Sequence, residues 1–396
     1  VKPKSTQFII DMTDFEQQII KMIRNKKSKT LPKLDNLMDD VLEKARVLEW
    51  AGVNFGKCVW YKLKLAMKKI MISENAVTLK LFGKIYGINS DYYILYGKLK
   101  SYPFQKYSKN PHFEPKGIEG VNAYTFWVSN NFLEDWYQLP DVTPQHLAQS
   151  VLFKYAFTGD LKAKVNSFVS FPGTEAHLLK CQVLRIMHSC FVVPDGYIET
   201  KTIENSEEMY GIDLGDKVTQ VREDFVMPTS NEELLTLDKW VHEFAYIFPN
   251  GKILETDPEA TQVGRMRSIS QDTPFSETRQ LWITREIGDK MQYNHPNGNT
   301  IAYSTVVVKN LRWSGFLCAA RSGEFVNIYI GDGSRSTPIL FYPTALKEIE
   351  KDVSEHKEHR EPNPEKEPVV IQPDTDEMNM DGEDMDMMGD DVEDMD

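Results

Sequence analysis

The sequence of 396 residues has few of the features that usually announce a function. Its four cysteines stand apart, without a Cys-x-x-Cys pair, and no apolar run at the amino end is typical of a signal peptide. No apolar segment approaches the roughly 20 residues that cross a bilayer. We therefore expect a soluble protein of a reducing, cytosolic compartment. The chain begins at Val1 without an initiator Met, which leaves open that upstream residues were processed or left out.

Negative charge is concentrated at the carboxyl end. Residues 351–396 hold 18 Asp and Glu against 4 Lys and Arg, a net charge of −14, so the total of −13 leaves +1 for residues 1–350. A nearly neutral body argues against general nucleic-acid binding, which needs a basic face. The acidic tail lacks the aromatic and branched residues needed to fold alone and has no EF-hand spacing. It is interpreted as a solvated polyanion rather than a calcium site.

The amino end begins with a short helical pattern. Thr13 and Glu16 have the spacing of a capping box, and an apolar stripe follows them to Ile23. Six Lys and Arg residues then lie within residues 21–33. We interpret this basic run as a solvated linker, with contact to an acidic surface as the alternative.

A helical corner follows. Apolar residues recur every three to four positions over residues 34–48, up to Gly52, and again over residues 59–70 after Gly56. This pattern predicts two packed helices joined by a glycine-bounded turn. Because Trp50 follows the first apolar stripe into the turn, we expect its side chain to be buried there.

The middle of the chain mixes strand and helix patterns. Thr143 followed by Pro144 predicts the start of a helix whose buried stripe runs to Tyr155 through Leu147, Val151 and Leu152. Strands are predicted over residues 77–88, 92–99, 123–128, 136–139, 165–171 and 178–193. The first two are rich in aromatic and branched residues and are separated by Asn89-Ser90-Asp91, which predicts a hairpin.

The last third is predicted to be a helix followed by a meander. Residues 195–229 are interpreted as a long connection. Ser230 and Glu233 repeat the capping-box spacing ahead of an amphipathic helix over residues 234–248. Strands separated by Asn-Gly, Ser-Gly and Asp-Gly turns are then predicted over residues 281–287, 300–308, 315–320 and 325–330.

These patterns predict an α+β fold, in which N-terminal helices precede mixed helices and a largely antiparallel sheet, and an acidic disordered C-terminal tail ends the chain. We expect five regions: an N-terminal helical region, a mixed α/β region, a connecting segment, a helix-plus-meander region and the acidic tail. Their predicted bounds are residues 1–76, 77–194, 195–229, 230–345 and 346–396.

One cluster has zinc-ligand chemistry. His177, Cys181, His188 and Cys190 lie within fourteen residues. On the predicted strand, however, the first pair lies far from the second, and no turn residues would close a tetrahedral site. Buried cysteines and surface histidines are the favoured interpretation.

No other motif indicates catalysis. Gly331-Asp332-Gly333-Ser334 lacks the remaining glycine and the lysine of a phosphate-binding loop, so a hairpin turn is favoured. The carboxylate pairs Asp39-Asp40 and Glu232-Glu233 are typical of helix caps and solvated faces. No nucleophile elbow, His-Glu-x-x-His helix or kinase motif occurs. We predict no catalytic, cofactor-binding or metal residue and no cofactor.

Several separated segments, in the right order, resemble the radial spoke head protein 4/6 family of motile cilia. Ser314 and Asp332 depart from the family pattern, which usually has a Pro and an aromatic residue there. The resembling segments are residues 49–53 (Glu-Trp-Ala-Gly-Val), 82–85, 122–124 with Trp136 and 139–140, 157–161, 171–173, 239–242, 311–315 and 327–331.

The resemblance implies a non-enzymatic structural subunit of the radial spoke head in a nine-plus-two axoneme. Such a subunit pairs with a like subunit or paralogue, adjoins the radial spoke head protein 9 type, and helps relay signals from the central pair to dynein. It implies a place in the cytoplasm, on the cytoskeleton of the ciliary axoneme, with neither nucleic acid nor membrane as a partner. The related radial spoke head protein 9 slot, and a cytosolic enzyme or ligand-binding domain with an unrecognised pocket, remain the alternatives.

Overall fold

A computed structural model describes residues 38–99, 120–132, 134–168, 170–201, 218–228, 230–253, 266–294, 300–321 and 323–338. All of these residues lie in the first of two units into which the chain divides, residues 1–339 and 340–396. The predicted helix at residues 13–23, the basic run at 21–33, the Asn297-Gly298 turn and the acidic tail at 346–396 lie outside the described residues.

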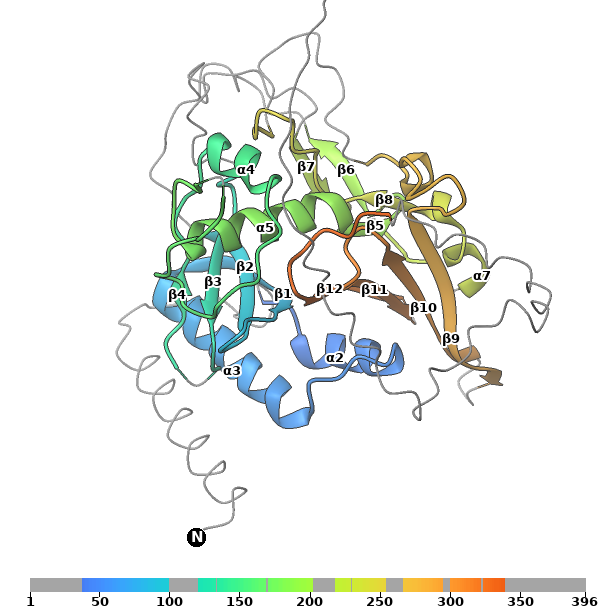
Figure 1. Ribbon diagram of the computed structural model, residues 1–396. Coiled ribbons are helices and arrows are strands. Elements are labelled where there is room, and N and C mark those ends of the chain that lie inside the picture. Colours follow the sequence, from blue (N-terminus) through green and yellow to red (C-terminus); the bar gives the residue numbers. More distant parts are fainter. Residues whose placement is uncertain are drawn as a thin grey trace, which may run out of the picture. The chain divides into compact units, whose positions relative to one another are not determined.

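The described part of the chain is built on one eight-stranded sheet with the strand order β4-β3-β2-β1-β12-β11-β10-β9 (Figure 1). Every neighbouring pair in the sheet is antiparallel except the central pair, β1 and β12, which is parallel. The strands are β1 (Ala76–Ile85), β2 (Tyr92–Leu99), β3 (Thr125–Ser129), β4 (Tyr137–Gln138), β9 (Trp282–Asn294), β10 (Thr300–Asn310), β11 (Phe316–Arg321) and β12 (Glu324–Gly331).

Helices cover both faces of this sheet. The helices α2 (Val41–Trp50) and α3 (Lys57–Glu74) pack on one face, and α5 (Glu175–Cys190) packs on the other (Figure 1). Neighbouring strand residues face opposite layers, as the two-residue period of a strand requires: Val307 packs toward α2 and α3, whereas Val306 and Val308 pack toward α5. Burial on both faces explains the apolar runs at residues 92–96 of β2 and 316–320 of β11.

The smaller elements complete the described part. Two two-stranded sheets are formed by β5 (Val192–Pro194) with β8 (Trp240–His242), and by β6 (Ile198–Lys201) with β7 (Val218–Val221). The remaining helices are α4 (Pro144–Ser150), the single turn α7 (Asn231–Leu234), and two short 3-10 turns, η3 (Leu237–Lys239) and η4 (Ile269–Gln271). Among the described helices we find none with the length and apolar content of a bilayer span.

Much of the predicted local structure is confirmed. The α+β class, the 77–99 hairpin and the final meander are all present. The helix start at Pro144 is confirmed too, because Thr143 caps it by accepting a hydrogen bond from the backbone N–H of His146. Asp40 caps α2 by accepting from the Leu42 N–H at 3.0 Å, and Gly52 follows the helix with a φ of +81°. The five predicted regions stay predictions, although β1–β4 and β9–β12, from two of them, share one sheet.

The predicted strand over residues 178–193 is wrong, because most of that segment forms helix α5. All but two of its 16 residues are buried, the polar residues Lys180, Gln182 and Arg185 included. The apolar residues Leu179, Val183, Ile186 and Cys190 recur every three to four positions, which is the spacing of a helix. The length of the segment, well beyond the usual 4–8 residues of a strand, also favoured a helix.

Three further predictions are corrected by tertiary contacts. The amphipathic helix over residues 234–248 is wrong beyond its first turn, because the chain turns to pair Trp240–His242 with β5. The predicted connection at 195–229 contains the β6–β7 pair. No strand forms over the described part of residues 165–171, where Val165 and Phe171 enter the core singly while Phe168 is exposed.

The helical corner also differs from its prediction. Trp50 is 41% exposed, and the buried tryptophan is Trp60, whose Nε1 donates to the Asn54 side chain at 3.1 Å. Trp50 lies two positions after buried Leu48, which turns its side chain to the other side of the helix. In the same way Val151 and Leu152, expected in a buried stripe, lie beyond the end of α4 and are exposed.

The central pair of strands generates a stability prediction. Gly83 of β1 has a φ of +135°, and a Cβ atom there would clash with the backbone carbonyl of Tyr329 in β12. Gly83→Ala should therefore lower the free energy of unfolding by more than about 3 kcal/mol, measured by urea denaturation. Gly52→Ala is the control: φ is +81° but no atom lies within 4 Å of the added methyl group, so a cost of about 1–2 kcal/mol is expected. If both variants lost the same free energy of unfolding, the close approach of Gly83 to the Tyr329 carbonyl would be contradicted.

Candidate functional site

The four zinc-ligand candidates lie on or next to one helix. His177 is in the first turn of α5, Cys181 follows one turn later, and His188 and Cys190 are at its end. The histidines bond to backbone groups: the Thr174 N–H donates to His177 Nδ1 at 3.2 Å, and His188 Nδ1 lies 2.6 Å from the Ala245 carbonyl oxygen. Burial raises the pKa of both thiols. No group of three His, Cys, Asp or Glu suited to a metal occurs in the described ranges.

His177 instead belongs to a pair of helix caps. Thr143 with His146, and Thr174 with His177, each form a capping box with the histidine in the position usually taken by Glu or Gln. Each Nδ1 accepts from a backbone N–H, which requires the neutral ring protonated on Nε2. The two rings lie 5.1 Å apart, and burial together with the neighbouring His146 lowers the pKa of His177.

A buried carboxylate holds the loop that follows α4. Glu175 is fully buried, and its oxygens accept from the Tyr92 hydroxyl at 2.7 Å, the Tyr155 hydroxyl at 3.1 Å and the backbone N–H groups of Thr158 and Gly159. Burial, with Glu175 nearby, raises the pKa of Tyr155 to about 12. With its oxygens satisfied by protein donors, Glu175 acts as a structural clamp on the Phe-Thr-Gly segment.

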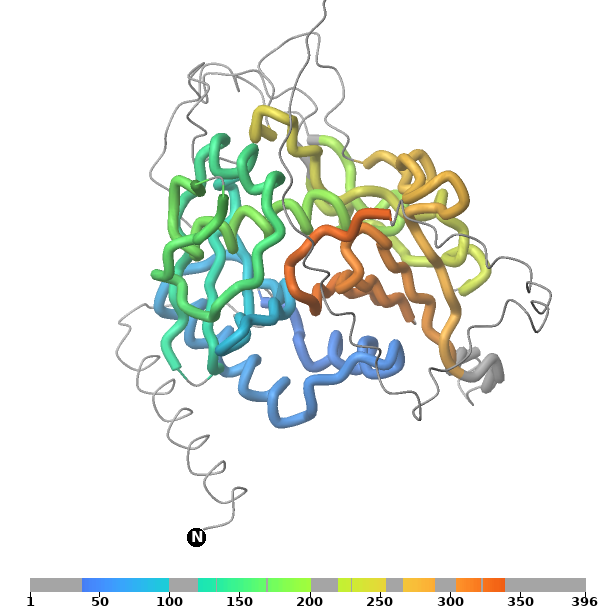
Figure 2. Tube along the Cα trace, viewed as in Figure 1, coloured from blue at the N-terminus to red at the C-terminus, as the bar shows by residue number. Residues whose placement is uncertain are grey.

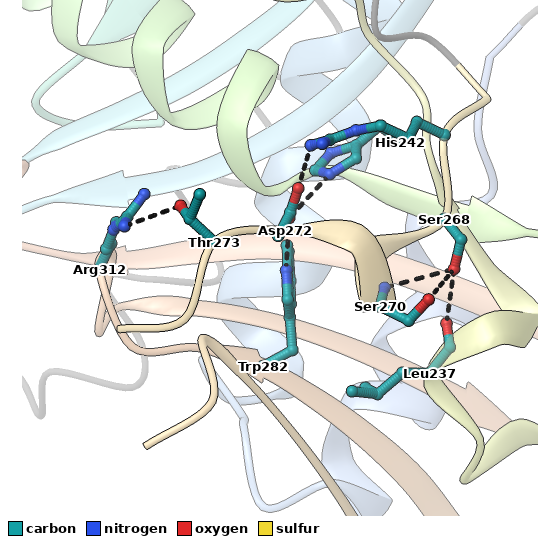
Figure 3. Close-up of polar contacts among 9 residues, drawn as sticks. Leu237, His242, Ser268, Ser270, Asp272, Thr273, Trp282 and Arg312 are labelled. Carbon is teal, nitrogen blue, oxygen red and sulfur yellow. Dashed lines mark hydrogen bonds and ion pairs between the residues drawn. The ribbon is translucent and has the colours of Figure 1, made fainter. Parts of the chain in front are cut away.

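A second polar cluster surrounds Asp272 (Figure 3). Asp272 also lines a cavity of about 480 Å³. One carboxylate oxygen accepts from Trp282 Nε1 at 2.7 Å and from His242 Nε2 at 3.0 Å. The other pairs with the guanidinium of Arg267. Burial alone would raise the pKa of Asp272, but hydrogen bonds, that from His242 foremost, hold it below its usual value.

This cluster joins segments that are distant in the sequence. His242 comes from β8, Trp282 from the start of β9, and Asp272 from the turn after η4 (Figure 3). On the opposite side of Asp272, Thr273 accepts from the side chain of Arg312 at 3.2 Å. The cavity floor includes Trp313, which is 2% exposed.

The segment 331–334 was expected to be a hairpin turn, and this is wrong within the described residues, because no strand follows β12 up to residue 338. Its polar groups bond locally. The Gly333 N–H donates to the Tyr329 hydroxyl at 3.0 Å, and Asp332 accepts from the Ser334 N–H at 3.0 Å. Such a turn has its own donors occupied and is not a phosphate cradle.

Sequence patterns did not single out Glu175 or Asp272 as special carboxylates. Neither stands in a recognised motif, since each is defined by donors that come from other elements. An indirect sequence signal came from three of the resembling segments. Residues 157–161 supply backbone donors to Glu175, and residues 239–242 supply His242, a donor to Asp272. Residues 311–315 include Arg312 and Trp313, which line the cavity.

The α+β chain is similar in sequence to proteins of one family over most of its length. The model of the family described as "Radial spokehead-like protein" matches residues 6–109 and 97–368. The chain is 25% identical over 373 residues to mouse radial spoke head protein 6 homolog A, covering 78% of this chain and 51% of that protein. It is 23% identical over 361 residues to human radial spoke head protein 4 homolog A, with 78% and 49% covered.

A third relative is an alga's protein. Over 338 residues the chain is 23% identical to flagellar radial spoke protein 4 of Chlamydomonas reinhardtii, covering 77% of this chain and 69% of that protein. The chain spans about half the length of the mouse and human relatives. It belongs to the radial spokehead-like protein family, and the resemblance inferred from separated segments is confirmed.

The contacts of Asp272 predict a pH-dependent stability. Asp272→Asn removes the charge that pairs with Arg267 and should lower the free energy of unfolding at pH 7 by about 2–4 kcal/mol. Because the folded-state pKa lies below the unfolded value of about 3.9, the carboxylate stabilises the protein above that pH and loses its contribution as the pH falls through the folded pKa.

Urea unfolding of both proteins between pH 7 and pH 3 checks this, and the gap between them should narrow only below about pH 4. Asp238→Asn, at an exposed position on η3, is the matched control and should have little effect. A gap that stays constant down to pH 3 would show that the ionised carboxylate is not what stabilises the fold.

Proposed function

We propose that this protein is a structural, non-enzymatic subunit of the radial spoke head in the axoneme of motile cilia or flagella. The observation that carries the proposal is the family match over residues 6–109 and 97–368, which includes all of the described residues. The relatives are named radial spoke proteins of types 4 and 6, which supports a type 4/6 position in the spoke head over the position of the related radial spoke head protein 9.

In this role the protein contacts other spoke head subunits, among them a like subunit or paralogue and the radial spoke head protein 9 type. The head meets the central pair transiently and relays its signals to the control of dynein. Two structural features support a contact-making role. Large aromatic side chains, including Trp50, Tyr61, Tyr86 and Tyr137, are exposed, and the sheet ends in the edge strands β4 and β9.

Axoneme fractionation tests the proposed location. A tagged full-length chain, expressed in ciliated cells from its own locus, should remain with detergent-extracted, salt-washed axonemes together with tubulin. Loss of the gene should remove density at the spoke heads in axonemal tomograms. Release of the tagged chain with the soluble ciliary matrix would contradict the proposal and would favour a cytosolic enzyme or ligand-binding domain.

Substitutions of two tryptophans in the helical corner distinguish a loss of partner binding from a loss of folding stability. Trp50 is 41% exposed, with the Arg321 guanidinium 4.1 Å from its ring centre, whereas Trp60 is 3% exposed in the same corner. Trp50→Ala should cost only about 1 kcal/mol of stability, the scale of one cation–π contact, and should weaken co-purification of other spoke head subunits. Trp60→Ala should cost about 3–5 kcal/mol.

Thermal unfolding of the purified variants and co-purification from cilia are the two measurements. If Trp50→Ala retains its melting temperature and its co-purifying subunits, Trp50 is not a contact residue. If Trp50→Ala lowers the melting temperature as much as Trp60→Ala does, Trp50 stabilises the fold and the proposed contact role is contradicted.

A further inference from the structure

The cavity beside Asp272 has an unbalanced charge. Arg185, Arg267, Arg312 and Arg335 all line it, and Asp272 is the one acidic residue among its described lining residues. Asp272 is already engaged by Arg267, His242 and Trp282. Within the described ranges no acidic side chain pairs with Arg185, Arg312 or Arg335. Three guanidinium groups therefore line one cavity, and no carboxylate of the described residues neutralises their charge.

Arg185 forms the buried part of this surface. It is 8% exposed, and its Nη1 donates to the Ser150 carbonyl oxygen at 2.8 Å and to Gln182 Oε1 at 3.0 Å, which orients the guanidinium. The group also lies 5.4 Å from the ring centre of Trp313. Burial, and after it the positive charge of Arg335, lowers the pKa of Arg185 to about 10. At neutral pH it remains charged, so the cavity contains a desolvated cation held in place by neutral groups.

Arg312 and Arg335 form the outer part. Arg312 is half-buried and its guanidinium is held by Thr273 and by the Pro274 carbonyl oxygen. Its own carbonyl accepts from the Ser336 N–H at 2.7 Å, which holds the segment that carries Arg335 against the cavity. Burial and the nearby Arg312 lower the pKa of Arg335. The Arg335 side chain itself is exposed. Like charges that repel one another are stabilised when an anion enters between them.

We propose that this cavity binds the carboxylate side chains of an acidic peptide segment through Arg185, Arg312 and Arg335. The planar guanidinium fork matches the two oxygens of a carboxylate. The volume of about 480 Å³ exceeds what one small oxyanion needs, and the apolar residues Leu147, Phe248 and Trp313 in the wall suit the aliphatic stems of a peptide. The inference does not depend on the proposed ciliary function.

The test measures binding of a fluorescein-labelled hexaglutamate peptide to the purified full chain by fluorescence anisotropy at about 50 mM salt. We expect saturable binding that weakens at higher salt and is absent for hexaglutamine. The double variant Arg312→Gln/Arg335→Gln should weaken binding at least about tenfold. The matched control, Arg46→Gln/Arg285→Gln, removes the same charge from exposed positions outside the cavity and should stay within about twofold of the unaltered chain.

Two results would overturn the proposal. Equal weakening in both double variants would show nonspecific attraction, and saturable binding of inorganic phosphate without binding of hexaglutamate would show a small-anion site. Thermal unfolding of each variant confirms that it is folded.

The acidic peptide has two possible sources, another protein or this chain's own residues 351–396 with their net charge of −14. A full-length variant whose acidic residues from 374 to 396 are replaced by Asn and Gln separates them. A severalfold rise in hexaglutamate affinity identifies residues 374–396 as a competitor for the cavity, and an unchanged affinity excludes them as one. Both results support the site, because each requires binding that the Arg312→Gln/Arg335→Gln variant loses.

Discussion

The described structure depends on the parallel pairing of β1 with β12 at the centre of the sheet. The strands β1–β4 and β9–β12 each form an antiparallel set. Among the described strands, the two sets are joined by the parallel register from Gly83 with Tyr329 to Ile85 with Gly331. Figure 2 shows the light-blue trace of β1 beside the orange trace of β12. Parallel neighbours require a long connection, and here that connection includes α4, α5 and the two small sheets. A glycine at position 83 is required because the Tyr329 carbonyl occupies the space of a side chain.

Once the two sets of strands are joined, both faces of the sheet expose apolar side chains that must be covered. The connection between β4 and β9 therefore has to provide a helix for one face. Helix α5 lies across one face with nearly all of its residues buried, polar ones included. Buried polar groups need partners, and here the partners come from the loops. Glu175 holds the segment after α4, and Asp272 joins β8 to β9, so irregular backbone is fixed by carboxylates rather than by regular structure.

The described part of the chain presents two kinds of surface. Exposed aromatic side chains and sheet edges offer broad contacts, which the proposed role in the spoke head would use. The arginine-lined cavity offers a local, charged contact of a different kind. In the proposed role, the proposed anion-binding cavity would add a contact that responds to salt and charge to a permanent association.

The amino-acid sequence by itself determined the features that depend on near neighbours. Runs of aromatic and branched residues separated by turn residues predicted the hairpin and the meander. The Thr143-Pro144 pair predicted a helix start, and separated segments identified the family. Only the tertiary structure decided the rest. Residues 175–190 lie buried across one face of the sheet, which their local pattern did not indicate, and residues 240–242 are a strand because β5 lies beside them. Likewise, Arg185, Arg312 and Arg335 share a cavity because the fold brings distant segments together, and pairing between distant segments leaves no local pattern to detect.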